Sequence, residues 1–309
     1  MKYAWILSLF VVVSCSKADR MQTSLSPSNQ PSITAQQTSN GQAATLATTR
    51  VFMAPRHTFV IWFENKGYSQ IVGNSNAPYI NSLIKKGTLF TNAHALTHPS
   101  YPNYVAWFSG STQGIKNDDC INGAVYSRKT VYNYLSDKGV SFQWYSEGLP
   151  FVGSRTCQNG YYVEKHNPTT IFSTVAKYVN QPLSAMNRTD TATFKKSARV
   201  SCITPNLMHD MHDGSIAQGD SWLKQNFSTL INWCLIHHSV FIIYFDEDNG
   251  TTDNRIPVIM LGLQVKAGYK DATYYNHYSF TKSILHWWGA DSTFTSHLAN
   301  AKTIQNIWN

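Results

Sequence analysis

Short apolar runs that alternate with helix-like segments constrain the fold of this 309-residue chain most strongly. A run of β-branched and aromatic residues without polar alternation predicts a strand buried on both faces. Such strands are expected at residues 57–63, 88–96, 141–145, 199–203, 239–245 and 257–261, and helices at 77–86, 100–110, 130–138, 221–233 and 278–288. This alternation predicts an α/β fold, a mostly parallel central sheet with helices on both faces.

Two of the expected strands lead directly into oxygen-bearing side chains: Glu64 and Asn65 after the first, and Asp246, Glu247 and Asp248 after the second. Ligands of such sheets bind at the carboxyl ends of the strands. Crowded carboxylates repel each other unless a cation holds them, and oxygen donors suit Mg, Ca or Mn. Each motif alone also fits a solvated turn, and Asp248-Asn249-Gly250 has typical turn residues.

The helix that begins near Ser100 offers a hydroxyl close to these motifs. Pro102 suits the first turn, and Gly110 is typical of a helix end. Ser100 could cap the backbone, which the stretch alone favours. It could also face a phosphate, because the N-terminus of a helix attracts anions. Taken with the two acidic strand ends, the second interpretation is the stronger one.

Further polar residues follow strands or open helices, namely His98, His166, Asn206, Asp210, His212 and His277. Such side chains can bind phosphate oxygens or protonate a leaving group. His166 fits equally well a cap before a helix-like stretch at 170–178. It belongs to an irregular segment, 111–198, that could be an insertion over the site.

The N-terminus predicts export. Lys2 precedes an apolar run at 5–13 that is too short to span a membrane, which is typical of a secretory signal. Val12-Val13-Ser14-Cys15 is similar to a bacterial lipobox, although an ordinary signal peptide could also contain a cysteine. We expect a lipoprotein signal at 1–15 with Cys15 lipidated, a disordered polar tether at 16–54, and a catalytic domain at 55–309. The protein would then be lipid-anchored in the bacterial cell envelope, facing the periplasm or the exterior.

Cysteine count and charge narrow the remaining possibilities. Cys120, Cys157, Cys202 and Cys234 make an even number, which predicts two disulfides outside the cytoplasm. Three connectivities are possible, and we favour sequential pairing, 120 with 157 and 202 with 234. The net charge of +8 favours anionic substrates or headgroups. Scattered Lys and Arg residues give no reason to expect a nucleic-acid partner.

Taken in order, the motifs at 64–69, 98–104, 165–168, 204–213, 245–248 and 276–278 resemble those of the bacterial and fungal acid phosphatase and phospholipase C phosphoesterases, within the alkaline-phosphatase superfamily. The resemblance implies an alkaline-phosphatase-like three-layer sandwich. It also implies a divalent metal ion held by Glu64, Asn65, Asp246 and Glu247. Glu247 stands where two-zinc relatives have His, which argues for one metal. Its identity stays open among Mg, Ca, Mn and Zn.

The resemblance also implies the roles of the other residues. The catalytic set would be Ser100 as nucleophile, Asn103 on a phosphoryl oxygen, and His212 and His277 near the leaving group. The substrate-binding set would be His98, His166, Asn206 and Asp210. The expected activity is that of a metal-dependent acid phosphatase that cleaves small anionic phosphomonoesters through a phosphoserine intermediate. Two alternatives stay open, a phospholipase C acting on lipid headgroups and a non-catalytic surface-binding lipoprotein.

Overall fold

A central nine-stranded sheet organises residues 53–309, the part of the chain that the computed structural model describes. Its strand order is β10-β2-β9-β8-β1-β7-β3-β6, with β11 also paired to β2. The strands are β1 (Thr58–Phe63), β2 (Thr88–His94), β3 (Phe142–Ser146), β6 (Asn180–Pro182), β7 (Val200–Thr204), β8 (Val240–Phe245), β9 (Arg255–Leu261), β10 (Tyr269–Asp271) and β11 (Tyr275–Asn276). Among them, β9 alone runs antiparallel to its neighbours, which confirms the mostly parallel sheet.

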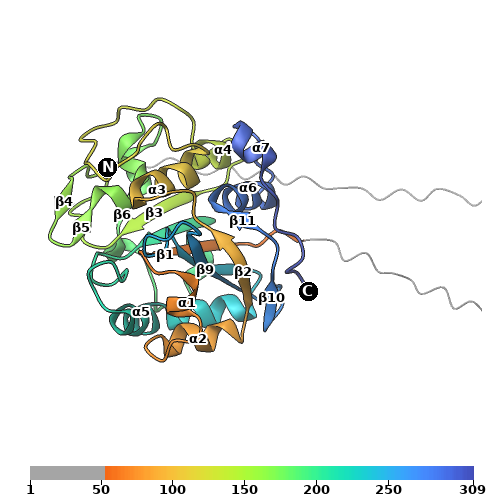
Figure 1. Cartoon of the computed structure of the whole chain (residues 1–309). Helices are drawn as coiled ribbons and strands as arrows, with labels where there is room; N and C mark the ends of the chain where they lie inside the picture. The colour runs from red at the N-terminus through yellow and green to blue at the C-terminus, as the bar shows by residue number, and fades with distance from the viewer. Residues whose placement is uncertain (1–52) are drawn as a thin grey trace, which may run out of the picture. The chain divides into compact units, whose positions relative to one another are not determined.

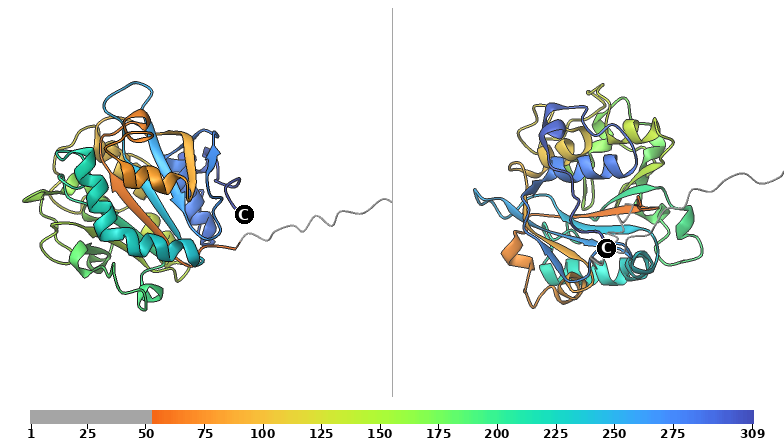
Figure 2. Two further views of the ribbon diagram at one scale, coloured as in Figure 1. Left: turned by 90° about the horizontal axis from the view of Figure 1, so that it is seen from below. Right: turned by 90° about the vertical axis from the view of Figure 1, so that its right-hand side faces the viewer.

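Helices cover both faces of this sheet (Figure 1). One face carries α1 (Tyr68–Ile71), α2 (Pro78–Ile84) and α5 (Ile216–Ile236), and the left view of Figure 2 looks onto it. The other face carries α3 (Ser100–Ser109), α4 (Val131–Ser136), α6 (His277–Trp287) and α7 (Ser296–Asn300). The expected three-layer α/β sandwich is therefore confirmed. None of the helices within residues 53–309 is both long and apolar enough to cross a bilayer.

The register of the two central strands positions the site. All six residues of β1 and all six of β8 are buried, as their unbroken apolar sequences predict. They run parallel with Phe63 opposite Phe245, so Glu64 and Asp246 leave the sheet side by side. Helix α3 lies beside them with every one of its ten residues buried, its polar side chains included.

The irregular segment contributes to the central sheet, because it supplies the edge strand β6 and the adjacent strand β3. It also forms the hairpin of β4 (Gln158–Asn159) and β5 (Tyr162–Val163). Its other elements are the short 3₁₀ helices η1 (Glu164–His166), η2 (Pro168–Ile171), η3 (Lys177–Val179), η4 (Leu183–Ala185) and η5 (Phe194–Lys196). The single helix expected at 170–178 is wrong, since η2 and η3 are separated there by extended backbone at Phe172.

The cysteine prediction is half right. Cys120 and Cys157 form a disulfide, but Cys202 and Cys234 are free and buried. Cys202 on β7 pairs in register with Val60, so its thiol shares the face of Trp62, which packs against α3. Cys234 lies on α5, across the sheet from α3 (Figure 1). The sheet therefore separates the two thiols. The expected signal peptide and nearly all of the expected tether lie outside the described residues.

Candidate active site

Ser100 is the first residue of α3, and its hydroxyl does not cap the helix. Pro99 occupies the capping position, so Ser100 does not fill the cap role that is the weaker of its two interpretations. The Ser100 Oγ lies 2.9 Å from Oε1 of Glu247 and 3.1 Å from Oε2 of Glu64. It lies 3.4 Å from Oδ1 of Asn65. A hydroxyl has one proton and satisfies one acceptor at a time. The Ser100 hydroxyl cannot donate to all three of these oxygens at once. A cation among them would satisfy the oxygens that it leaves unpaired.

Buried carboxylates surround this hydroxyl. The side chains of Glu64, Asp210 and Asp246 are fully buried. Burial, and then the neighbouring Asp210, raises the pKa of Glu64 well above its ordinary value. Burial, and then Glu64, does the same to the pKa of Asp246. Oδ2 of Asp246 and Oδ2 of Asp210 have no hydrogen-bond partner within the described part of the chain. Because unpaired buried carboxylate oxygens are costly, this donor set fits a bound cation.

His166 joins the cluster from the irregular segment. Its Nε2 lies 3.4 Å from Glu64 Oε2, and its Nδ1 lies 3.3 Å from Asp210 Oδ2. One ligand atom from each of these three residues lies within 4.8 Å of the others, so the trio could hold a metal ion. Burial, followed by the positive charge of Lys165, lowers the pKa of His166 well below its ordinary value. A neutral imidazole is the form that binds metals. His166 and Asp210, expected on the substrate, thus lie where they could be ligands.

Two further residues fix the geometry of the strand ends. Asn65 adopts a left-handed conformation with φ of 46°, which Asn tolerates better than most residues. This turn lets its backbone N–H donate to Oδ1 of Asp246 at 3.2 Å. The hydroxyl of Tyr104 donates to Glu64 Oε1. We did not predict Tyr104, although its position four residues after Ser100 places both on one face of a helix.

His98 orients Glu247 rather than standing free for substrate. Its Nδ1 bonds to Oε2 of Glu247, and its Nε2 lies 3.1 Å from the Thr251 carbonyl. The Thr251 carbonyl and an ionised Glu247 carboxylate both accept, so a doubly protonated ring satisfies both contacts. Partial burial opposes this charge, but the bonds to Thr251 and Glu247 outweigh it and raise the pKa of His98. The other oxygen of Glu247 is left to face Ser100.

The polar side-chain atoms of Asn103 and His277 are hydrogen-bonded to other groups of the protein. The Asn103 amide binds backbone groups of residues 96, 97 and 99, and so holds the loop before α3. His277 Nε2 donates to the Asp246 carbonyl, and its Nδ1 accepts from the Tyr244 hydroxyl, both at 2.7 Å. Burial lowers the pKa of His277 to about 4. These bonds position the site and leave neither side chain a free polar atom for a phosphate.

Asn206 and His212 differ in how close they come to the cluster. Oδ1 of Asn206 accepts the backbone N–H groups of Met208 and His209, so it shapes a turn. His212 is partly exposed, and its ring lies 5.9 Å from that of His166. Its Nε2 is 3.4 Å from the ammonium of Lys165. His212 is thus the expected catalytic histidine that both approaches the cluster and reaches solvent.

Residues 59–291 match the sequence model of the Phosphoesterase family. The chain belongs to this family. It is 36% identical over 253 residues to phosphatidylinositol-3-phosphatase of Mycobacterium tuberculosis, covering 82% of each chain. It is 32% identical over 249 residues to an acid phosphatase of Aspergillus fumigatus, covering 76% of this chain. It spans 55% of that fungal protein's length.

Solved structures agree with the fold of this phosphoesterase. A protein of the alkaline phosphatase superfamily from Vibrio parahaemolyticus superposes with a TM-score of 0.52 at 14% identity, over 77% of this chain and 68% of that one. The lipoteichoic acid synthase LtaP of Listeria monocytogenes gives 0.55 at 10% identity, over 80% and 76%. The phosphoesterase is therefore a hydrolase that acts on phosphoric ester bonds, as its sequence predicts. The phospholipase C alternative is not favoured by its relatives.

Proposed function

We propose that this phosphoesterase is an acid phosphatase that cleaves phosphomonoesters through a phosphoserine at Ser100. One observation carries the proposal: the Ser100 hydroxyl lies at the start of α3 within hydrogen-bond distance of Glu64 and Glu247, which follow two different strands. A buried serine surrounded by carboxylates suits a nucleophile better than a structural hydroxyl. The acid phosphatases among its relatives support this choice of substrate class.

A divalent metal ion would complete the site. Glu64, Asn65, Asp246 and Glu247 would hold it, with His166 and Asp210 as additional candidates. When bound, such an ion lowers the pKa of a nearby hydroxyl and neutralises charge on phosphoryl oxygens. The prevalence of oxygen donors favours Mg, Ca or Mn over Zn.

The chain's own residues perform the transfer. Oγ of Ser100 passes its proton to the neighbouring Glu247 carboxylate and attacks phosphorus, while the bond from phosphorus to the ester oxygen breaks. The leaving oxygen takes a proton from His212 or from water, and a water molecule later hydrolyses the phosphoserine to release phosphate. Asn103 and His277 act at a distance here, by holding the loop before α3 and the backbone of Asp246.

The decisive experiment replaces the nucleophile. Ser100→Ala should lower kcat on p-nitrophenyl phosphate by at least about a thousandfold. Ser109→Ala is the matched control, because Ser109 ends the same buried helix and bonds to the Val105 carbonyl. It should leave kcat nearly unchanged. Ser100→Ala protein that folds normally and keeps near wild-type activity would refute the assignment.

A phosphoinositide is a second candidate substrate, because the 36% identical relative is a phosphatidylinositol-3-phosphatase. Comparing kcat/KM on a short-chain phosphatidylinositol 3-phosphate with that on p-nitrophenyl phosphate would separate the two. A preference of more than about tenfold for the lipid would favour it. An enzyme that prefers the lipid should still hydrolyse p-nitrophenyl phosphate.

We also propose that the enzyme is exported and anchored through a lipid on Cys15. The support is the lipobox-like stretch that ends in Cys15. Cys15→Ser should move the protein from the membrane fraction to the soluble fraction of the bacterial envelope. An unchanged distribution, with no incorporation of labelled fatty acid into the wild type, would contradict the anchor.

A further inference from the structure

Lys165 contacts one residue that binds the helix of Ser100 and another that binds the buried cluster. Its ammonium lies 2.7 Å from Oδ2 of Asp118 and 3.4 Å from Nε2 of His212. Its side chain is 16% exposed, so it is largely covered yet within reach of solvent. His212 in turn donates its backbone N–H to Oδ1 of Asp210 at 2.8 Å. Lys165 therefore adjoins the carboxylate cluster on one side.

Asp118 ties the same ammonium to the start of α3. Its Oδ1 accepts the backbone N–H of Tyr101 at 3.0 Å, and Tyr101 directly follows Ser100. Its Oδ2 accepts from Lys165. One carboxylate thus bridges the first turn of the helix and the lysine. Because an ammonium has three N–H donors, the contacts with Asp118 and His212 leave one for an incoming anion.

The surroundings of Ser100 need such a donor. The nearest carboxylates, those of Glu64 and Glu247, would repel a phosphate dianion. The Asn103 amide is committed to backbone groups. Lys66, another lysine beside the carboxylates, donates to the Met211 carbonyl at 2.8 Å and keeps further N–H groups. Lys165 is preferred because Asp118 ties it to the first turn of the helix that begins with Ser100.

We propose that Lys165, oriented by Asp118, is the cation that binds the phosphate group of the substrate. This rests on the proposed function and assigns a substrate-binding residue to it. Lys165 directs its remaining N–H to a non-bridging phosphate oxygen, and Asp118 acts as a positioning residue through it. The two residues lie 47 positions apart in the sequence.

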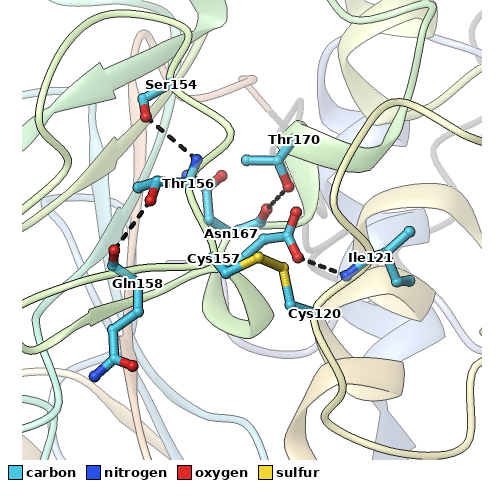
Figure 3. The surroundings of a disulfide bond; sticks show 9 residues. Cys120, Ile121, Ser154, Thr156, Cys157, Gln158, Asn167 and Thr170 are labelled. Carbon is cyan, nitrogen blue, oxygen red and sulfur yellow. Dashed lines mark hydrogen bonds between the residues drawn. A yellow bond between two sulfur atoms is a disulfide. The ribbon is translucent and has the colours of Figure 1, made fainter.

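A disulfide supports this pair. Cys120 lies two residues after Asp118, and the carbonyl of its partner Cys157 accepts the N–H of Glu164, next to Lys165. The Glu164 carboxylate also accepts the N–H of Ile121 at 2.9 Å, beside the disulfide in Figure 3. The two loops that present Asp118 and Lys165 are thus held together covalently and by hydrogen bonds.

The test measures phosphate binding separately from turnover. In the Ser100→Ala background, calorimetry with inorganic phosphate should show affinity about tenfold to a hundredfold weaker when Lys165→Met is added. Lys165→Arg should keep affinity within about threefold, since the charge remains. Asp118→Asn should fall between these two. Lys129→Met and Asp137→Asn are matched controls, because Lys129 and Asp137 form an exposed ion pair at 2.9 Å.

In the active enzyme, Lys165→Met should raise KM and the phosphate inhibition constant together, and Lys165→Arg should restore both. Unchanged phosphate affinity in the Lys165→Met protein, or no rescue by Arg in a folded variant, would overturn the inference. A wild-type enzyme that hydrolyses no monoester would instead refute the proposed function. The calorimetric result would still decide whether Lys165 binds phosphate.

Discussion

Removing the disulfide should destabilise the enzyme by an amount that its loop length sets. Cys120 and Cys157 are 37 residues apart, and closing a loop of that size restricts the unfolded chain by about 4 kcal/mol at 25 °C. The change is the double variant Cys120→Ala/Cys157→Ala. Because the folded loops keep their hydrogen bonds, most of the loss should come from the freer unfolded chain.

Urea unfolding followed by tryptophan fluorescence measures this loss. With an m-value of about 3 kcal/mol/M, a loss of 4 kcal/mol lowers the urea midpoint by about 1.3 M. Wild-type protein treated with reductant is the control and should unfold near the midpoint of the variant. A midpoint shift below about 0.3 M, in a variant with an unchanged m-value, would refute the loop-entropy reasoning. Phosphate affinity of the folded variant should also fall, because the loops of Asp118 and Lys165 lose their covalent tie.

Three further outcomes are expected. Tyr104→Phe should lower the free energy of unfolding by about 1–3 kcal/mol, measured in urea, because the buried Glu64 oxygen loses its donor; unchanged stability would contradict this. Burial, then Arg199, lowers the pKa of His57 to about 4, against 6.5 in the unfolded chain. The contribution of neutral His57 to the free energy of unfolding is therefore complete above pH 6.5. About 3 kcal/mol of it is lost as the pH falls towards 4. His57→Phe should make unfolding less dependent on pH across that window, and an unaltered slope would argue against the assignment. Chelator treatment should abolish hydrolysis, and Mg, Ca or Mn should restore it, with elemental analysis reporting the ion; full activity in metal-free protein would exclude a metal-dependent mechanism.

The sequence predicts the central sheet and the meeting of Ser100 with Glu64 and Glu247 because both have local signals. Each carboxylate directly follows a fully apolar run, and parallel strands bring their ends to one edge. No local signal in the sequence shows which side-chain atoms are already hydrogen-bonded within the protein. Whether His277 has a free nitrogen depends on Tyr244, which lies 33 residues away and on another element.

The pairs that the sequence did not reveal depend on tertiary structure alone. Asp118 and Lys165 come from loops with no periodic pattern, and only the folded chain places them together. The wrong pairing of Cys202 with Cys234 has a similar origin. Spacing along the chain cannot say on which side of a sheet a thiol will point. The cysteine count therefore predicted the disulfide of Cys120 with Cys157, but it could not show that Cys202 and Cys234 stay apart.

The complete enclosure of α3 bears on how this scaffold could acquire new substrates. Because no residue of this helix is exposed to water, lengthening it, shifting it or substituting polar residues into it would disturb the packing on every side. The loop around Asp118 is mostly exposed at residues 116–120 and is free of that restriction. Diversification of specificity should therefore accumulate in this loop, while the helix stays as it is.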